Sequence, residues 1–148
     1  MLKSLSLIIK PGEKVAVCGQ SGSGKTSLIL SLLQMIELQS GKIFVDGIDL
    51  ASLDRNNIRT RLSVITQEPF FIPGSLRLNL DPHEKTSDER IQSSIDKIGL
   101  WPRVEANGGL DMDFTASDWS AGERQLFSLA RALATQSPIL ILDEATSR

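Results

Sequence analysis

The stretch that decides the fold of this chain is Gly19-Gln20-Ser21-Gly22-Ser23-Gly24-Lys25-Thr26. A short run typical of a β-strand, Val15–Cys18, comes directly before it, and an apolar run typical of a helix, Leu28–Leu38, follows it. Glycines let a loop curl until successive backbone N–H groups point inward, where they can hold an anion. Strand, glycine loop and helix in this order fit the pattern G-x-x-x-x-G-K-[ST] and predict a phosphate-binding P-loop.

The residue types of this loop suit a nucleotide bound together with Mg²⁺. The helix that follows adds its first N–H groups and the positive end of its dipole. Lys25 is expected to reach the β- and γ-phosphates as a mobile charge, and the Thr26 hydroxyl is expected to ligate Mg²⁺. A flexible glycine linker, the alternative interpretation, does not account for the flanking strand and helix. The predicted phosphate-binding residues are Gly19, Gln20, Ser21, Gly22, Ser23, Gly24, Lys25 and Thr26.

Length, charge and cysteine content restrict the function further. The 148 residues, of which 41% are hydrophobic, are enough for one domain with a hydrophobic core. The formal net charge of −2 provides no basic field to hold nucleic acid. Cys18 is the single cysteine, so an intrachain disulfide is excluded. No apolar run reaches the roughly 18 residues of a membrane span, so action at a membrane requires a spanning part outside these residues.

Hydrophobic periodicity and turn residues predict strands that alternate with helices. Two capping boxes, Thr86–Glu89 and Ser120–Glu123, open helices that are expected to end near Gly99 and Ala134. The dipeptide Asp46-Gly47 predicts a tight hairpin. The remaining expected elements are strands at Leu5–Ile9, Val15–Cys18, Leu62–Thr66 and Ile139–Leu142, the last one fully buried, and a buried apolar helix at Thr26–Leu38 with its C-cap at Gly41. We therefore expect an α/β fold with a mostly parallel sheet and an antiparallel N-terminal β portion.

An acidic pair, Asp143-Glu144, follows the last predicted strand directly. The carboxyl ends of strands are where open α/β sheets bind their ligands, and an Asp in that position holds Mg²⁺ in P-loop proteins. Glu144 is then expected to orient or deprotonate the attacking water. Taken alone, the pair is also typical of the acidic start of another helix, and its coincidence with the P-loop favours the Mg²⁺ site.

The stretch Trp119-Ser120-Ala121-Gly122-Glu123-Arg124-Gln125 resembles the signature of the ATP-binding-cassette (ABC) ATPases. That signature is usually Leu-Ser-Gly-Gly-Gln, so this chain departs from it with Trp119, Ala121 and Glu123 and keeps the central Ser and the second Gly. The resemblance covers nearly the whole chain and is closest to the second nucleotide-binding domain of subfamily C exporters, the multidrug-resistance-associated type. It implies a P-loop NTPase fold with a helical signature subdomain.

The resemblance also implies how the residues divide between two ATP sites. Gln67 looks like the glutamine of the family's Q-loop, which touches Mg²⁺ and links to the transmembrane partner. Together with Thr26 and Asp143 it would hold Mg²⁺, and with Glu144 it would be catalytic. Ser120 and Gly122 would instead contact the γ-phosphate of an ATP held by a second nucleotide-binding domain, packed head-to-tail with this one around the sandwiched nucleotide.

The function expected from this resemblance is ATP binding and hydrolysis that powers export of a substrate across a membrane. The partners would be a second nucleotide-binding domain and the transmembrane domains of an exporter, with this domain at the cytoplasmic face and without nucleic acid. Two alternatives are a truncated remnant that binds nucleotide without catalysis, and an ABC ATPase that acts on nucleic acid or ribosomes. The second alternative is less favoured because the sequence contains neither a long coiled coil nor a basic tail.

We interpret residues 1–148 as part of such a domain, because four features usual in the family have no counterpart in them. These are the segment with the aromatic residue that stacks on adenine, the rest of the D-loop that the resemblance places from Ala145-Thr146-Ser147 onward, the strand after that loop, and the switch histidine at the end of that strand. In this fold class the strand lies between the P-loop strand and the strand before Asp143, so two apolar strands would expose their edges without it.

We therefore predict that residues 1–148 by themselves aggregate or are only marginally stable. Scanning calorimetry of the purified 148-residue chain, combined with size-exclusion chromatography, measures this directly. A soluble monomer with a cooperative thermal transition would contradict the prediction.

Overall fold

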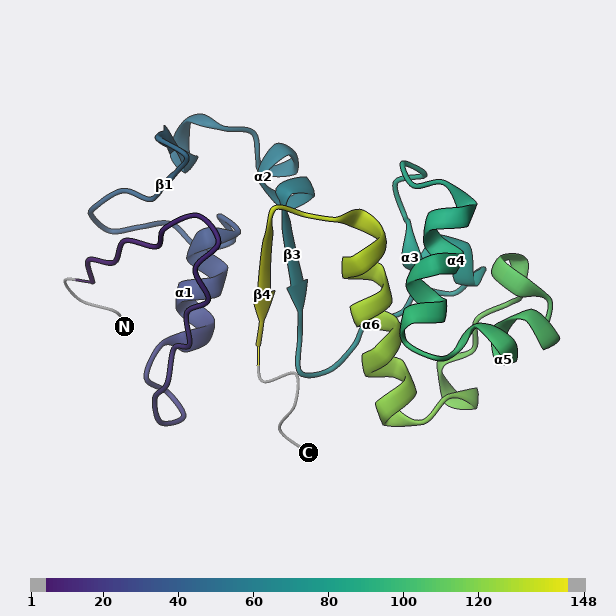
Figure 1. The fold of residues 1–148 in the computed structure, drawn as a ribbon. Coiled ribbons are helices and arrows are strands. Elements are labelled where there is room, and N and C mark those ends of the chain that lie inside the picture. Colours follow the sequence, from purple (N-terminus) through teal and green to yellow (C-terminus); the bar gives the residue numbers. More distant parts are fainter. Residues whose placement is uncertain (1–4, 144–148) are drawn as a thin grey trace. The chain divides into compact units, whose positions relative to one another are not determined.

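The computed structural model describes residues 5–143, and the chain divides into two compact units, Met1–Thr60 and Arg61–Arg148. Figure 1 shows the elements of each unit in chain order. The first unit contains α1 (Lys25–Leu32), β1 (Phe44–Val45), β2 (Ile48–Asp49) and the short 3₁₀ turn η1 (Leu50–Ser52), and α2 (Arg55–Arg61) carries the chain into the second unit.

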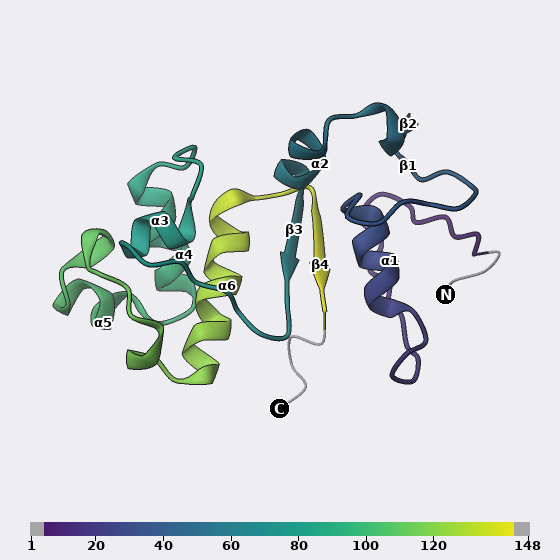
Figure 2. The same cartoon turned by 180° about the vertical axis from the view of Figure 1, so that it is seen from behind.

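The second unit is built from a parallel strand pair and a group of helices. Its elements are β3 (Leu62–Ile65), α3 (Leu76–Leu80), α4 (Asp88–Lys97), α5 (Trp101–Ala106), η2 (Gly109–Asp111), η3 (Ala116–Asp118), α6 (Ala121–Thr135) and β4 (Ile139–Leu142). Strands β3 and β4 pair in parallel, with Leu62 opposite Ile139. In Figures 1 and 2, α6 lies between this strand pair and the other helices. No helix in residues 5–143 has the length and apolarity needed to cross a bilayer.

The hydrophobic core of the second unit surrounds α6. Phe127 on α6 is fully buried, and its ring meets Phe114 and Trp119 edge to face, at centroid distances of 5.2 and 4.8 Å. Such edge-to-face pairs are favourable because the positive edge of one ring meets the negative face of the other. The buried residues of this core are Leu76, Leu80, Ile91, Ile95, Val104, Leu110, Phe114, Trp119, Phe127, Ala130 and Ala134.

Helix α6 begins and ends close to the predicted positions. Ser120 is its N-cap, and both hydrogen bonds of the capping box are formed: the Ser120 hydroxyl accepts from the Glu123 N–H, and the Glu123 carboxylate accepts from the Ser120 N–H. At the other end Gln136 takes a left-handed conformation, with φ at 48°. The capping box at Ser120–Glu123 and the helix that it opens are therefore confirmed.

Helix α4 confirms the predicted helix but not its predicted cap. Its N-cap is Ser87 instead of Thr86, and no side chain caps the helix, so the capping box expected at Thr86–Glu89 is wrong. The end of the helix is as expected, since Gly99 has φ at +76° and its N–H donates to the Asp96 carbonyl. Together with the bond from Leu100 N–H to the Ile95 carbonyl, this completes a Schellman motif.

The hairpin predicted at Asp46-Gly47 is confirmed. Strands β1 and β2 pair antiparallel, with Val45 opposite Ile48, and the two turn residues have φ values of 51° and 78°. Two successive positive φ values are characteristic of a type I′ turn, whose twist matches that of the paired strands.

Two predicted strands are absent from the described residues. Leu5–Ile9 and Val15–Cys18 have no strand conformation, and their apolar side chains Leu5, Leu7, Ile8, Ile9, Val15 and Val17 are exposed. A strand needs the N–H and C=O groups of a neighbouring strand, and these segments pair with none in residues 5–143. Strand β4 is paired but only partly buried: Leu140 and Leu142, which lie on the same face of the strand, are 50% and 58% exposed, so the expected full burial of this strand is wrong.

The helix after the P-loop is shorter and less buried than predicted. Helix α1 ends at Leu32, because Gln34 takes a left-handed conformation with φ at 51°. The Gln34 and Met35 N–H groups then donate to the carbonyls of Ser31 and Leu30, so the chain closes the helix there. Gly41 also has a positive φ of 88° but caps no helix.

Truncating the central aromatic residue is expected to disrupt the second unit. We predict that Phe127→Ala lowers the free energy of unfolding by about 3–5 kcal/mol, because it leaves a cavity between Phe114 and Trp119. Amide hydrogen exchange of α6 in the native full-length protein measures the change, and Phe70→Ala, at a side chain that is 72% exposed, is the matched control. Equal exchange of the α6 amides in the two variants would contradict the prediction.

Candidate functional site

The P-loop residues form a tight turn that leads directly into α1. The Ser23 N–H donates to the Gln20 carbonyl over 3.1 Å, which closes the loop. Gly24 is the N-cap of α1 and has φ at +97°, a conformation that L side chains rarely adopt. The first bond of the helix ladder runs from the Leu28 N–H to the Gly24 carbonyl, so the N–H groups before Leu28 face out of the helix end, as an anion site requires.

Lys25 is the first residue of α1, and its ammonium group bends back over the loop. Its Nζ donates to the Gly19 carbonyl over 2.7 Å and to the Gln20 carbonyl over 3.2 Å. Thr26, one residue further, is exposed. The loop thus presents a cation and an accessible hydroxyl at the same helix end, which is the donor set that a nucleotide phosphate with Mg²⁺ calls for.

Ser120 and Gly122 lie at the N-terminus of α6. The Ser120 hydroxyl accepts a hydrogen bond from the Glu123 N–H over 3.2 Å, and it also forms a hydrogen bond with the Glu123 carboxylate. A Cβ added at Gly122 would meet no atom within 4 Å in the part of the chain that the structure describes, so packing there does not require glycine at this position. The open space beside Gly122 leaves room for a group to approach the backbone closely.

Gln67 and Asp143 follow the carboxyl ends of neighbouring parallel strands. Gln67 comes two residues after β3, and Asp143 comes directly after β4. The Asp143 N–H donates to the Ile65 carbonyl over 2.9 Å, which extends the strand pairing to the acidic residue. The structure therefore brings the ends that carry these two side chains to one edge of the sheet, as the sequence predicts.

The oxygen atoms at these positions fit Mg²⁺ better than a softer metal. The predicted ligands are the hydroxyl of Thr26, the side-chain amide of Gln67 and the carboxylate of Asp143, which are hard oxygen donors. Within residues 5–143 no three His, Cys, Asp or Glu side chains cluster as a metal site. A single carboxylate with neutral oxygens is typical of Mg²⁺ that retains waters and binds phosphate.

The predicted site residues are divided between the two units. The P-loop residues Gly19 to Thr26 belong to the first unit, whereas Gln67, Ser120, Gly122 and Asp143 belong to the second. Glu144, the predicted catalytic base, lies outside the described residues.

Arg131 on α6 fastens the segment that follows Gln67. Its Nε donates to the Asn79 carbonyl over 2.6 Å, and a terminal nitrogen donates to the Phe70 carbonyl over 3.3 Å. Burial lowers the pKa of Arg131, although a guanidinium stays charged in proteins. This cation, which sequence reasoning did not single out, anchors the chain after Gln67 to the helix that begins at the signature.

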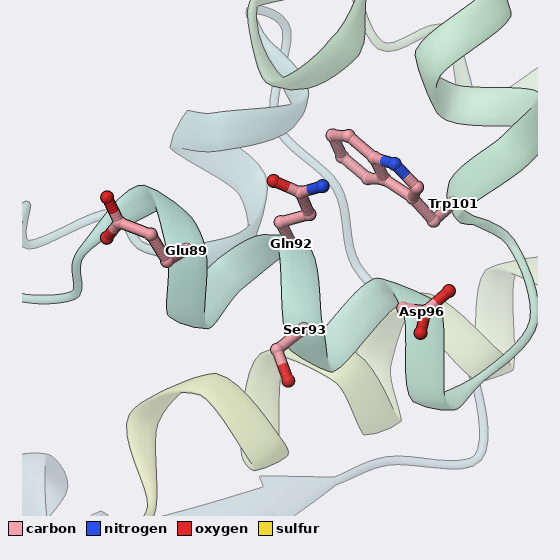
Figure 3. Close-up of a pocket in the computed structure, with 5 residues that line it drawn as sticks. All are labelled: Glu89, Gln92, Ser93, Asp96 and Trp101. Atoms are coloured by element: carbon pink, nitrogen blue, oxygen red, sulfur yellow. The ribbon is translucent and has the colours of Figure 1, made fainter.

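A shallow open depression of about 460 Å³ lies on α4 and α5, away from the predicted site residues. Its lining residues are Glu89, Gln92, Ser93, Asp96 and Trp101. In Figure 3, Gln92 and Trp101 extend to the same side of α4, whereas Ser93 points to the opposite side. Because these side chains do not converge on a common point, the depression is not a candidate active site.

Comparison with known proteins decides the family of the chain. The family model described as ABC transporter matches residues 2–147. The chain belongs to the ABC transporter family. Membership in this family implies a P-loop NTPase fold, and the helices and small sheets of the structure are consistent with it.

Several curated members of the ABC transporter family are similar over almost the whole chain. ABC multidrug transporter B of Aspergillus fumigatus is 46% identical over 147 residues, which cover 99% of this chain and 10% of the relative. ABC transporter ecdL of Aspergillus rugulosus is 46% identical with the same coverage. ATP-binding cassette sub-family C member 8 of Rattus norvegicus is 42% identical over 150 residues, 99% of this chain and 10% of the relative. The chain thus spans about a tenth of the length of these relatives.

Removing the cap of α6 is expected to loosen the helix end that carries the signature. We predict that Ser120→Ala lowers the stability of this end by about 1 kcal/mol, because the Glu123 N–H loses its acceptor. Amide hydrogen exchange at Glu123 measures the effect, and Ser120→Thr, which keeps a hydroxyl, is the matched control. Equal exchange at Glu123 in the two variants would contradict the prediction.

Proposed function

We propose that residues 1–148 are part of a nucleotide-binding domain of an ABC exporter, which binds and hydrolyses ATP to power transport. The observation that carries this proposal is the P-loop geometry, in which a left-handed Gly24 opens α1 and Lys25 bends over the loop carbonyls. The family supplies the reaction class, and the loop supplies the place where the phosphates bind.

Lys25 has a specific part in this proposal. An ammonium group donates three hydrogen bonds, and in the structure it donates to the carbonyls of Gly19 and Gln20. An incoming triphosphate offers charged oxygens, which are stronger acceptors than these carbonyls. The Lys25 ammonium would therefore turn from the loop to the β- and γ-phosphates, while the N–H groups at the start of α1 surround the remaining oxygens.

Thr26, Gln67 and Asp143 would hold Mg²⁺ beside the β- and γ-phosphates. Mg²⁺ in that position would neutralise charge on the phosphate oxygens as the γ-phosphate leaves ADP. Gln67 and Glu144 would orient the attacking water, and Glu144 would accept its proton as the bond to the γ-phosphorus forms. Glu144 follows Asp143 in sequence, so β4 would position both acidic residues.

Ser120 and Gly122 would act on a second nucleotide rather than on the one bound by Lys25. The position of the Ser120 hydroxyl at the N-terminus of α6 and the open space beside Gly122 suit contact with the γ-phosphate of an ATP held by a partner domain. A second nucleotide-binding domain packed head-to-tail would bring this α6 terminus to the partner's P-loop. Closure of the two domains over ATP, followed by hydrolysis, would drive the transmembrane part between its inward- and outward-facing states.

The transmembrane domains would belong to the longer protein of which these residues are part. Support comes from the relatives, which are about ten times longer and include one that is named a multidrug transporter. This domain would then lie at the cytoplasmic face of a membrane. The transported substrate would bind in transmembrane helices rather than in these residues.

The role of Glu144 provides the test of this function. We predict that Glu144→Gln in the native full-length protein lowers the rate of ATP hydrolysis by about 10²- to 10⁴-fold, because the amide cannot accept a proton from water. ATP binding should persist, since Gln keeps the size and polarity of Glu. Steady-state ATPase assays and binding of radiolabelled ATP measure the two quantities.

The matched control is Lys25→Ala, which should lose ATP binding as well as hydrolysis because the P-loop cation is removed. Hydrolysis at the wild-type rate in Glu144→Gln would refute the role of Glu144. A wild-type protein that binds ATP without turnover would instead support the non-catalytic alternative.

A further inference from the structure

Two departures of the signature from the family pattern, Trp119 and Glu123, contact the same side chain. Arg103 on α5 lies with its guanidinium carbon 4.0 Å from the centre of a Trp119 ring, which is cation–π geometry. One terminal nitrogen forms an ion pair with the Glu123 carboxylate, and the other donates to the Asp118 carbonyl over 2.9 Å. Arg103 therefore joins α5 to the N-terminal end of α6 at three points.

Glu123 brings a negative charge to the end of the helix where an anion would bind. One of its carboxylate oxygens accepts from the Ser120 N–H over 2.8 Å, and this hydrogen bond is the main reason why the pKa of Glu123 is lowered. The carboxyl is thus ionised at neutral pH, as a glutamate with an ordinary pKa would also be. A phosphate that approaches Ser120 would meet this charge, whereas the glutamine usual in the family signature would present none.

Arg103 offsets that negative charge. In the described part of the chain it is the cation that forms an ion pair with Glu123. Arg124 lies nearby on α6, but its guanidinium donates to the carbonyls of Ala116 and Trp119. The Arg103 side chain also covers Trp119. A single arginine therefore balances the charge of Glu123 and packs against Trp119, two residues that differ from the usual family signature.

We propose that Arg103 is a positioning residue of the signature segment, which neutralises Glu123 so that the N-terminus of α6 can receive the γ-phosphate of a nucleotide held by a partner domain. This inference rests on the proposed function, because it assigns a role within the same ATP site. The proposal couples Arg103 to Glu123. Removal of the Arg103 guanidinium should therefore affect ATP hydrolysis only while the Glu123 carboxylate is present.

The test measures KM and kcat for MgATP hydrolysis by the native full-length protein. Arg103→Met removes the charge but keeps an aliphatic chain to cover Trp119. This variant is expected to raise KM by about two- to fivefold, the range of a partly exposed ion pair. Adding Glu123→Gln to Arg103→Met should return KM to the wild-type value, because no carboxylate is then left uncompensated.

Two further variants separate charge from packing. Arg103→Lys keeps a positive charge and should leave KM closer to wild type than Arg103→Met does. Arg90→Ala removes an exposed arginine of α4 and serves as the control with unchanged kinetics. If Arg103→Met does not fold, Arg103→Lys is compared with the wild type instead. A KM of Arg103→Lys that is raised about two- to fivefold, as expected for loss of the charge, would then contradict the proposal.

The outcomes distinguish this inference from the proposed function. An unchanged KM in Arg103→Met, in a protein that hydrolyses ATP, would overturn the role of Arg103 and leave the proposed function intact. A raised KM that Glu123→Gln does not restore would also overturn it, since loss of packing would affect both variants alike. Absence of ATP hydrolysis in the wild-type protein would overturn the proposed function and this inference with it.

Discussion

The burial of α6 is the constraint on which the second unit depends. One side of this helix packs on β3 and other parts of it pack on α3 and α4, with Phe127 fully buried among aromatic rings. Its N-terminus carries Ser120 and Gly122, and its C-terminus leads through a short turn into β4. The same helix therefore sets the position of the signature and feeds the strand that delivers Asp143. A change in its packing would move both parts of the proposed chemistry.

Several arginines connect the separate segments of this unit to one another. Arg77 on α3 forms ion pairs with Asp88 and Asp111, and its hydrogen bond to Asp111 is the main reason why the pKa of Arg77 is raised. Arg131 holds the segment after Gln67, and Arg103 holds the signature. A guanidinium suits this use because it is planar, always charged and able to donate in several directions at once. Loops that carry candidate site residues are thus fixed by contacts to rigid elements.

The two units differ in how their local geometry is maintained. The core of the second unit is formed by residues between Leu76 and Ala134, whereas apolar side chains such as Val15 and Val17 in the first unit are exposed. The P-loop nevertheless forms its turn, because the bonds from Ser23 to Gln20 and from Lys25 to Gly19 lie within the loop. Within residues 5–143, the contacts that hold the P-loop turn are therefore short-range hydrogen bonds.

Features that arise from neighbouring residues could be predicted from the sequence. The capping box of α6, the type I′ hairpin at Asp46-Gly47 and the end of α4 at Gly99 each depend on hydrogen bonds and backbone angles within a few residues. Strands were harder to predict, because apolar runs such as Val15–Cys18 become strands only beside a partner. The sequence does not predict the early end of α1 at Leu32, because the left-handed residue that follows it is Gln34 rather than a glycine.

The sequence by itself determined the P-loop, the signature with its departures and the acidic residue after a strand, since each is a short pattern whose chemistry is set by residue type and spacing. Only the tertiary structure decided that Arg103 joins Trp119 and Glu123 and that Arg131 holds the chain after Gln67. The physical reason is that these contacts span many residues along the chain and form only when α5 and the post-Gln67 segment pack against α6.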